Sequence, residues 1–136
     1  MWAMGAEAIM RALLTADAGV TALVGASIYP VVIPAGLEPA RALVIDLLSN
    51  DPVLTIDGLN QSAAMFTADV QVTCIAHTYA DVKALTAVVK TAAHLKRGSV
   101  AGSSVVSSVL SSEGADEYDP EQSVFLQSVR YVITYQ

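Results

Sequence analysis

Strict alternation of apolar and polar residues marks positions 64–77 as a β-strand. One set of alternate positions carries apolar side chains, and most of the intervening positions carry polar ones. Such a strand is half buried, as in an antiparallel sheet that packs one face on a core. The apolar set is Phe66, Ala68, Val70, Val72, Cys74 and Ala76, and the intervening set is Met65, Thr67, Asp69, Gln71 and Thr73.

Two longer segments have the three-to-four spacing of apolar residues that is typical of amphipathic helices. The first covers about 3–17, and a further short helical turn is expected over 20–24. The second begins after Thr78, which can cap it together with Asp81, and runs to about residue 95. The expected buried stripes are Ala6, Ile9, Met10 and Leu13 in the first helix, and Val82, Leu85, Val89, Ala92 and Ala93 in the second.

The remaining apolar segments predict further strands. Prolines at positions 30 and 34 keep 28–34 extended, because each proline forces its predecessor out of the helical region. Other strands are expected over 42–49, 53–56, 103–112 and 124–135, with a turn at Asp57-Gly58. The last strand is apolar on both faces, which indicates a central position or a subunit interface. The pattern predicts one α+β domain over residues 1–136, with a mainly antiparallel sheet and two principal helices packed against it.

Composition adds a surplus of apolar residues to this picture. Hydrophobic residues make up 54% of the 136 positions and charged residues only 15%, whereas soluble domains typically carry about 25% charge. No run approaches about 18 apolar residues without charge or proline, so no membrane span is expected. The surplus therefore favours a subunit that buries additional surface against other copies or partners.

The net charge, the single cysteine and the first residues exclude further classes of protein. A net charge of −6 argues against general nucleic-acid binding, which needs clustered positive charge. The single cysteine excludes an internal disulfide framework. The first residues lack the basic region of a signal peptide, which indicates an intracellular product.

Few residues have the spacing that catalysis or metal binding requires. Cys74 and His77 fall on opposite sides of their strand, and His94 lies on the following helix, so a buried cysteine and surface histidines are expected. One cysteine and two histidines are too few for a zinc site, and no metal or other cofactor is expected. The glycine-rich segment 98–104 lacks the lysine of a P-loop and follows a helix, so it is expected to be a helix stop and a flexible loop.

The distribution of charge is more informative. Lys83, Lys90 and Arg97 are spaced by seven residues, which predicts one basic face on or just after the second helix. Five of the thirteen acidic residues fall within 113–121. The two groups are either a solvated helix face and loop or complementary patches that meet between neighbouring copies. The second interpretation pairs Lys83, Lys90 and Arg97 with Glu113, Asp116, Glu117 and Asp119 of a neighbour.

Several short motifs, in a fixed order, resemble those of a known family. They are residues 14–20 (LTADAGV) with 22–24 (ALV), 28–30 (IYP), 55–58 (TIDG), 70–72 (VQV), 79–81 (YAD), 118–121 (YDPE) and the closing strand to Tyr135. In this order the chain resembles the small tail-completion proteins of long-tailed phages, which are also called tail terminators or tail-to-head joining proteins. The resemblance covers nearly all of 7–135 and carries no catalytic residues.

The resemblance implies an α+β subunit that assembles into a homo-oligomeric ring, typically a hexamer. Such a ring caps the tail tube, ends its polymerisation and joins it to the head connector. The expected location is the tail or neck of a virion, with assembly in the cytoplasm of the bacterial host. DNA would pass through the lumen, and an acidic subunit suits that passage because it would not hold the phosphate backbone.

Two other functions stay open at this point. One is another neck or connector protein of the same phage or gene-transfer particle. The other is a small acid–base enzyme that uses a strand carboxylate, Asp46 or Asp69. Asp69 lies on the polar face of its strand, whereas Asp46 lies between two apolar residues, and both are expected to be solvated or interface carboxylates.

Overall fold

The computed structural model describes residues 5–34, 40–53 and 65–136. Within these ranges the chain forms three helices and seven strands. In chain order they are α1 (Ala6–Thr15), α2 (Ala18–Val24), β1 (Ile28–Pro30), β2 (Arg41–Val53), β3 (Met65–Ala76), α3 (Tyr79–Ala93), β4 (Lys96–Val100), β5 (Ser103–Glu113), β6 (Glu117–Asp119) and β7 (Val124–Tyr135).

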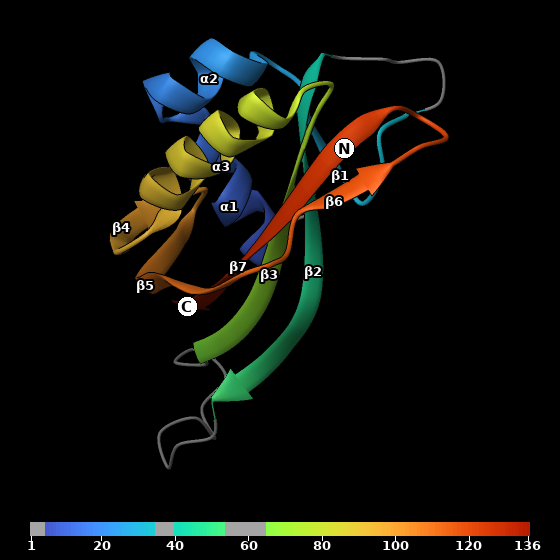
Figure 1. The fold of residues 1–136 in the computed structure, drawn as a ribbon. Coiled ribbons are helices and arrows are strands. Elements are labelled where there is room, and N and C mark those ends of the chain that lie inside the picture. The colour runs from blue at the N-terminus through green and yellow to red at the C-terminus, as the bar shows by residue number, and fades with distance from the viewer. Residues whose placement is uncertain (1–4, 35–39, 54–64) are drawn as a thin grey trace.

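The seven strands form one curled sheet, and the helices lie together on one of its faces (Figure 1). The strand order is β1-β2-β3-β7-β5-β4, with β6 paired to β7. Every pairing is antiparallel except that of β1 with β2. The α+β class and the mainly antiparallel sheet are therefore confirmed, and the short helical turn is a third helix, α2.

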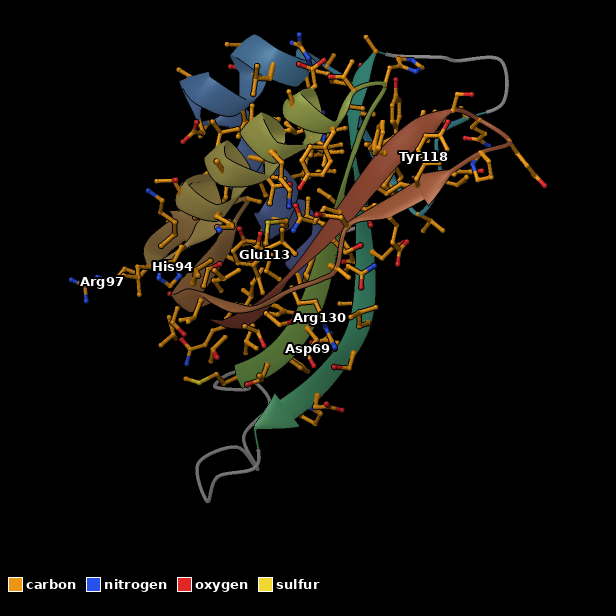
Figure 2. The ribbon with its side chains drawn as sticks, in the orientation of Figure 1. Asp69, His94, Arg97, Glu113, Tyr118 and Arg130 are labelled. Carbon is orange, nitrogen blue, oxygen red and sulfur yellow. The ribbon has the colours of Figure 1, made fainter. Side chains whose placement is uncertain are left out.

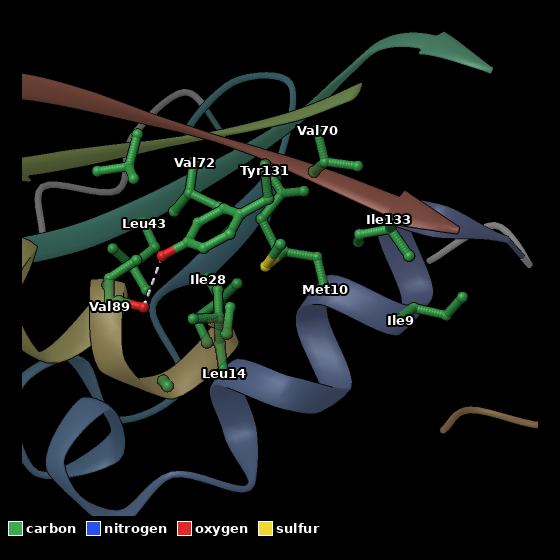
Figure 3. Close-up of a cluster of buried hydrophobic side chains, with 14 of the residues drawn as sticks. Ile9, Met10, Leu14, Ile28, Leu43, Val70, Val72, Val89, Tyr131 and Ile133 are labelled. Carbon is green, nitrogen blue, oxygen red and sulfur yellow. Dashed lines mark hydrogen bonds between the residues drawn. The ribbon is translucent and has the colours of Figure 1, made fainter. Parts of the chain in front are cut away.

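The core lies between the helical layer and the covered face of the sheet (Figure 3). Ile9, Met10 and Leu14 of α1 are fully buried against side chains of β3 and β7. The Tyr131 hydroxyl crosses this layer and donates a hydrogen bond to the Val89 carbonyl of α3, at 2.8 Å. This bond ties the longest helix to the middle of the sheet.

The ends of α3 follow from local sequence, but its C-terminal end differs from the prediction. The Thr78 hydroxyl accepts a hydrogen bond from the Asp81 backbone N–H at 3.2 Å, which confirms the N-terminal cap. The helix stops at Ala93, and Leu95 adopts a left-handed φ of 57° that turns the chain away. The expected stop at Gly98 was wrong, because Gly98 lies inside strand β4.

The segment 98–104 is a β-hairpin and not a flexible loop. β4 and β5 join through Ala101 and Gly102, which both have positive φ values of 51° and 81°. Two-residue hairpin turns of type I′ require this conformation at both positions. β4 was not predicted, because a five-residue strand with charged residues at its start has no clear alternation.

Two other strands differ from their predicted bounds. β2 is one strand of 13 residues with a bulge between Leu47 and Ser49, where a shorter strand over 42–49 was expected. The bulge interrupts the alternation, which explains the early end. The predicted strand 53–56 lies outside the described residues after position 53, and so does the turn at Asp57-Gly58. β7 lies between β3 and β5, which confirms its predicted central position.

The acidic segment after β5 contains the short strand β6 and is not a plain turn. β5 and β6 pair with the same edge of β7, where Glu113 faces Val129 and Glu117 faces Leu126. The chain advances four residues from Glu113 to Glu117, whereas the facing part of β7 advances three, from Val129 to Leu126. The junction between β5 and β6 therefore contains one extra residue. Gly114 marks this junction, and its N–H donates to the Ser128 carbonyl at 2.7 Å. The junction presents its acidic side chains beside α3.

Candidate interaction surface

The predicted basic face is divided between two elements. Lys83 and Lys90 lie on α3, two helical turns apart, and each side chain is partly exposed. Arg97 does not continue this face, because the helix has ended and the residue belongs to β4. Figure 2 shows Arg97 projecting away from the body of the protein. The structure therefore confirms only two members of the expected helical face.

Two of the acidic residues lie against the helix lysines of the same chain. Lys83 forms an ion pair with Asp116, and the Lys90 Nζ lies 3.0 Å from the Glu113 Oε2. The Tyr79 hydroxyl donates a second hydrogen bond to Asp116 at 3.0 Å. The hydrogen bond between Lys83 and Asp116 raises the pKa of the lysine and lowers the pKa of the carboxyl. These contacts hold α3 to the junction between β5 and β6.

Gln127 forms hydrogen bonds with one member of each ion pair. Its side chain is only 4% exposed, on the first half of β7. The amide oxygen accepts from the Lys83 Nζ at 3.2 Å, and the amide nitrogen donates to the Glu113 Oε1 at 3.0 Å and to the Gly114 carbonyl at 3.1 Å. We refer to Tyr79, Lys83, Lys90, Glu113, Asp116 and Gln127 as the α3–β5 network. Gln127 was not among the predicted residues, although the alternation of its strand places it on the same side as Val129 and Tyr131.

The three other charged candidates lie outside this network. Glu117 and Asp119 belong to β6, and the only contact described for either side chain joins the Asp119 Oδ1 to the Glu121 N–H at 3.0 Å. Within the described residues, neither of them nor Arg97 forms an ion pair. Tyr118, between the two acids, packs its ring 4.8 Å from that of Phe125. These three charges therefore have no oppositely charged partner within the described chain.

Two of the three residues weighed for nucleophilic chemistry, Cys74 and His94, have structural roles. Cys74 is fully buried, and burial raises the pKa of its thiol to about 12. His94 lies just beyond α3, and its Nδ1 accepts a hydrogen bond from the Leu110 N–H at 3.0 Å. His77 is exposed at the end of β3. Among the described residues, no three histidine, cysteine or acidic side chains gather into a possible metal site.

The two strand carboxylates lie on the face of the sheet that the helices leave open. Asp69 accepts a hydrogen bond from the Ser49 hydroxyl at 3.2 Å. Asp46 faces Gln71 across the β2–β3 pair, and partial burial raises the pKa of its carboxyl. Asp46 and Asp69 therefore lie in two different cross-strand rows on the same face of the sheet. Among the described residues, no helix has both the length and the hydropathy that a membrane crossing needs.

Fold and surface together define a small α+β protein with one helix-covered sheet face, in which three ion pairs join elements that are distant in sequence. The family model described as "Tail completion protein gp17" matches residues 8–136, and the chain belongs to this family. The family comprises structural virion proteins and not enzymes, so the chain is a structural protein of a phage tail. The resemblance found in the sequence is confirmed, and the acid–base alternative gains no support.

A solved structure shows the same fold. A chain in the structure titled "Virion of native gene transfer agent (GTA) particle" has a TM-score of 0.65 and 21% sequence identity to this protein. The alignment covers 95% of this chain and 92% of the other. At this level of identity the likeness concerns the fold. No curated protein sequence matches the chain.

Proposed function

We propose that the protein is a ring-forming tail terminator that caps the tail tube and joins it to the head connector. The match of a tail-completion family over residues 8–136 carries this proposal. The similar chain supports it, since that chain belongs to a structure titled as the virion of a gene transfer agent particle. The protein would act by shape and by contacts, in the tail or neck of a phage, prophage or gene-transfer particle, after assembly in the host cytoplasm.

The proposal assigns the charged candidates to two tasks. The side chains of Lys83, Lys90, Glu113 and Asp116 are between 37% and 42% exposed, so a neighbour can reach them. Their first task is to fix α3 against the sheet, because each is already paired within the chain. Arg97, Glu117 and Asp119 remain as charges that a neighbouring subunit would neutralise. Exposed pairs contribute about 0–1 kcal/mol each, so they would set register while apolar contacts supply affinity.

Assembly on purified particles tests the proposal. Native mass spectrometry and negative-stain microscopy of the protein, alone and mixed with tail tubes, should show closed rings, with six copies as the expected number. The rings should bind the ends of tail tubes and block further addition of tube subunits. Binding to head connectors without binding to tubes would identify another neck protein instead. A monomer under all of these conditions would refute the proposal.

The same purified protein tests the expectation that the ring does not bind nucleic acid. With a net charge of −6, the ring should not hold duplex DNA at low salt. Fluorescence anisotropy with a labelled duplex at 50 mM salt measures this directly. Tight binding that weakens steeply with added salt would contradict an acidic lumen that lets DNA pass.

A further inference from the structure

The outer edge of β2 is open beyond its first five residues. β1 pairs with β2 only at Leu43, Val44 and Ile45, and the last hydrogen bond on this side joins the Val31 N–H to the Ile45 carbonyl. From Asp46 to the end of β2, no strand within the described ranges pairs with this edge. An open strand edge exposes unpaired backbone groups and readily pairs with another strand.

The opposite end of the sheet is a second open edge. β4 pairs only with β5, and four of its five residues are exposed. The guanidinium of Arg97 projects from it into solvent (Figure 2). Leu95, just before the strand, is 73% exposed, and Leu47 and Leu48 of β2 are 39% and 44% exposed. Each edge therefore combines open backbone with an apolar side chain.

The register places the two edges at the same level of the sheet. Two cross-strand rows, separated by one intervening row, can be followed from one edge to the other through β4, β5, β7, β3 and β2. They are Lys96-Ser108-Ile133-Ala68-Asn50 and Gly98-Val105-Tyr135-Phe66-Pro52. Arg97 lies between these rows on β4, and Asp51 lies between them on β2. If a second copy is related to the first by a rotation without a shift along the strands, β4 of one copy lies beside the open part of β2 of the other.

Strand direction and charge fit the same contact. Four antiparallel pairings separate β2 from β4, so the two strands run in the same direction. Copies related by rotation would therefore pair in parallel, as β1 already pairs with β2. β4 carries Lys96 and Arg97, whereas the open edge of β2 carries Asp46 and Asp51. Pro52 has no N–H and would end the pairing.

We propose that β4 of one copy adds to the open edge of β2 of the next copy, over residues 46–51, with Arg97 beside Asp51. Contacts between two different edges are heterologous and close into a ring when the rotation allows. The inference rests on the proposed ring and names the contact that builds it. It also gives Arg97 a partner other than the acidic residues of β6, Glu117 and Asp119.

Charge-reversal variants test the pairing. Asp51→Arg and Arg97→Glu should each raise the concentration for half-assembly about tenfold or more, since both place like charges across the contact. The double variant D51R/R97E should return it to within about threefold of the wild type. The matched control R97E/E117R restores the total charge through an acid of β6 and should remain defective. Circular dichroism confirms that each monomer is folded.

The outcomes separate this inference from the proposed function. If the wild type forms a ring but the single variants assemble as well as it does, the edge contact is overturned and the proposed ring is not. The same conclusion follows if E117R, and not D51R, rescues R97E. A wild type that forms no ring, alone or on tail tubes, would overturn both. Oxidation of the D51C/R97C variant, which places the two cysteines opposite each other in the proposed pairing, adds an independent measurement. Covalent ladders of subunits are expected, and their absence in an assembled ring would contradict the pairing.

Discussion

The contacts of the α3–β5 network predict that Gln127→Glu lowers the stability of the protein. The substitution hardly changes side-chain volume, but the new carboxylate cannot donate. It removes the hydrogen bonds from the amide nitrogen to the Glu113 Oε1 and to the Gly114 carbonyl. It also places a negative charge next to Glu113, in a position where the present side chain is only 4% exposed. The variant should therefore be destabilised at neutral pH.

The magnitude follows from the contacts. Each lost donation to a buried or charged acceptor costs about 1–3 kcal/mol, and the lower half of this range applies because Glu113 is partly hydrated. Repulsion from Glu113 and attraction to Lys83 act at similar distances and largely cancel. The free energy of unfolding should fall by about 3 kcal/mol, which lowers the melting temperature of a domain of this size by about 10 °C.

Thermal unfolding of the wild type and Q127E from pH 7 to pH 4 provides the assay. Because Glu113 and Lys83 largely offset each other, burial is the main influence and raises the pKa of the introduced carboxyl, so it takes up a proton early as the pH falls and regains one donor. The deficit should therefore shrink toward pH 4. Gln122→Glu, the same change at an exposed position, is the control and should alter stability by less than about 0.5 kcal/mol. Equal melting temperatures for Q127E and the wild type would refute the network's structural role.

Four further predictions concern stability in the wild-type background, each read by thermal or urea unfolding. Leu14→Ala empties a fully buried site and should cost about 2–5 kcal/mol, and Tyr131→Phe removes the hydroxyl that binds the Val89 carbonyl and should cost about 1 kcal/mol. Asp46→Asn should stabilise the protein at pH 7, because the folded state raises the pKa of Asp46, and the gain should vanish as the pH falls below the ordinary value of 3.8. Asp116→Asn should destabilise it above pH 3.8, because the pKa of Asp116 is lowered in the folded state, and the difference should disappear in more acidic solution. A loss that persists unchanged at low pH would contradict the ion pair as its cause.

Elements with regular periodicity could be predicted from the sequence, and elements defined by irregular backbone could not. β3 alternates without interruption, and α3 has a capping threonine, so both were predicted within a few residues. The bulge after Leu47 and the left-handed turn at Ala101 and Gly102 depend on single backbone angles. No pattern of apolar residues reports these angles, and β4 and the full length of β2 were missed for that reason.

The candidate site shows a different limit. The sequence identified complementary charges, but spacing cannot reveal whether such charges meet within one chain or between copies. The answer depends on the junction at Gly114, which brings Glu113 and Asp116 back beside α3. Gln127 was missed because its role depends on three neighbours that are distant in sequence, and only the folded sheet brings them together.

The surplus of apolar residues is the observation that links the monomer to the proposed assembly. Among the residues that the structure describes, nine large hydrophobic side chains are exposed, and five of them lie on or next to β1, β2 or β4 toward the two edges of the sheet. A protein that functioned alone would guard these edges with charge and leave few apolar side chains there. In the proposed edge contact, the open edges bring apolar side chains and opposite charges to matching levels, so Leu47, Leu48 and Leu95, which the monomer leaves exposed, would be covered by the neighbouring copy. The five are Val31, Val32, Leu47, Leu48 and Leu95.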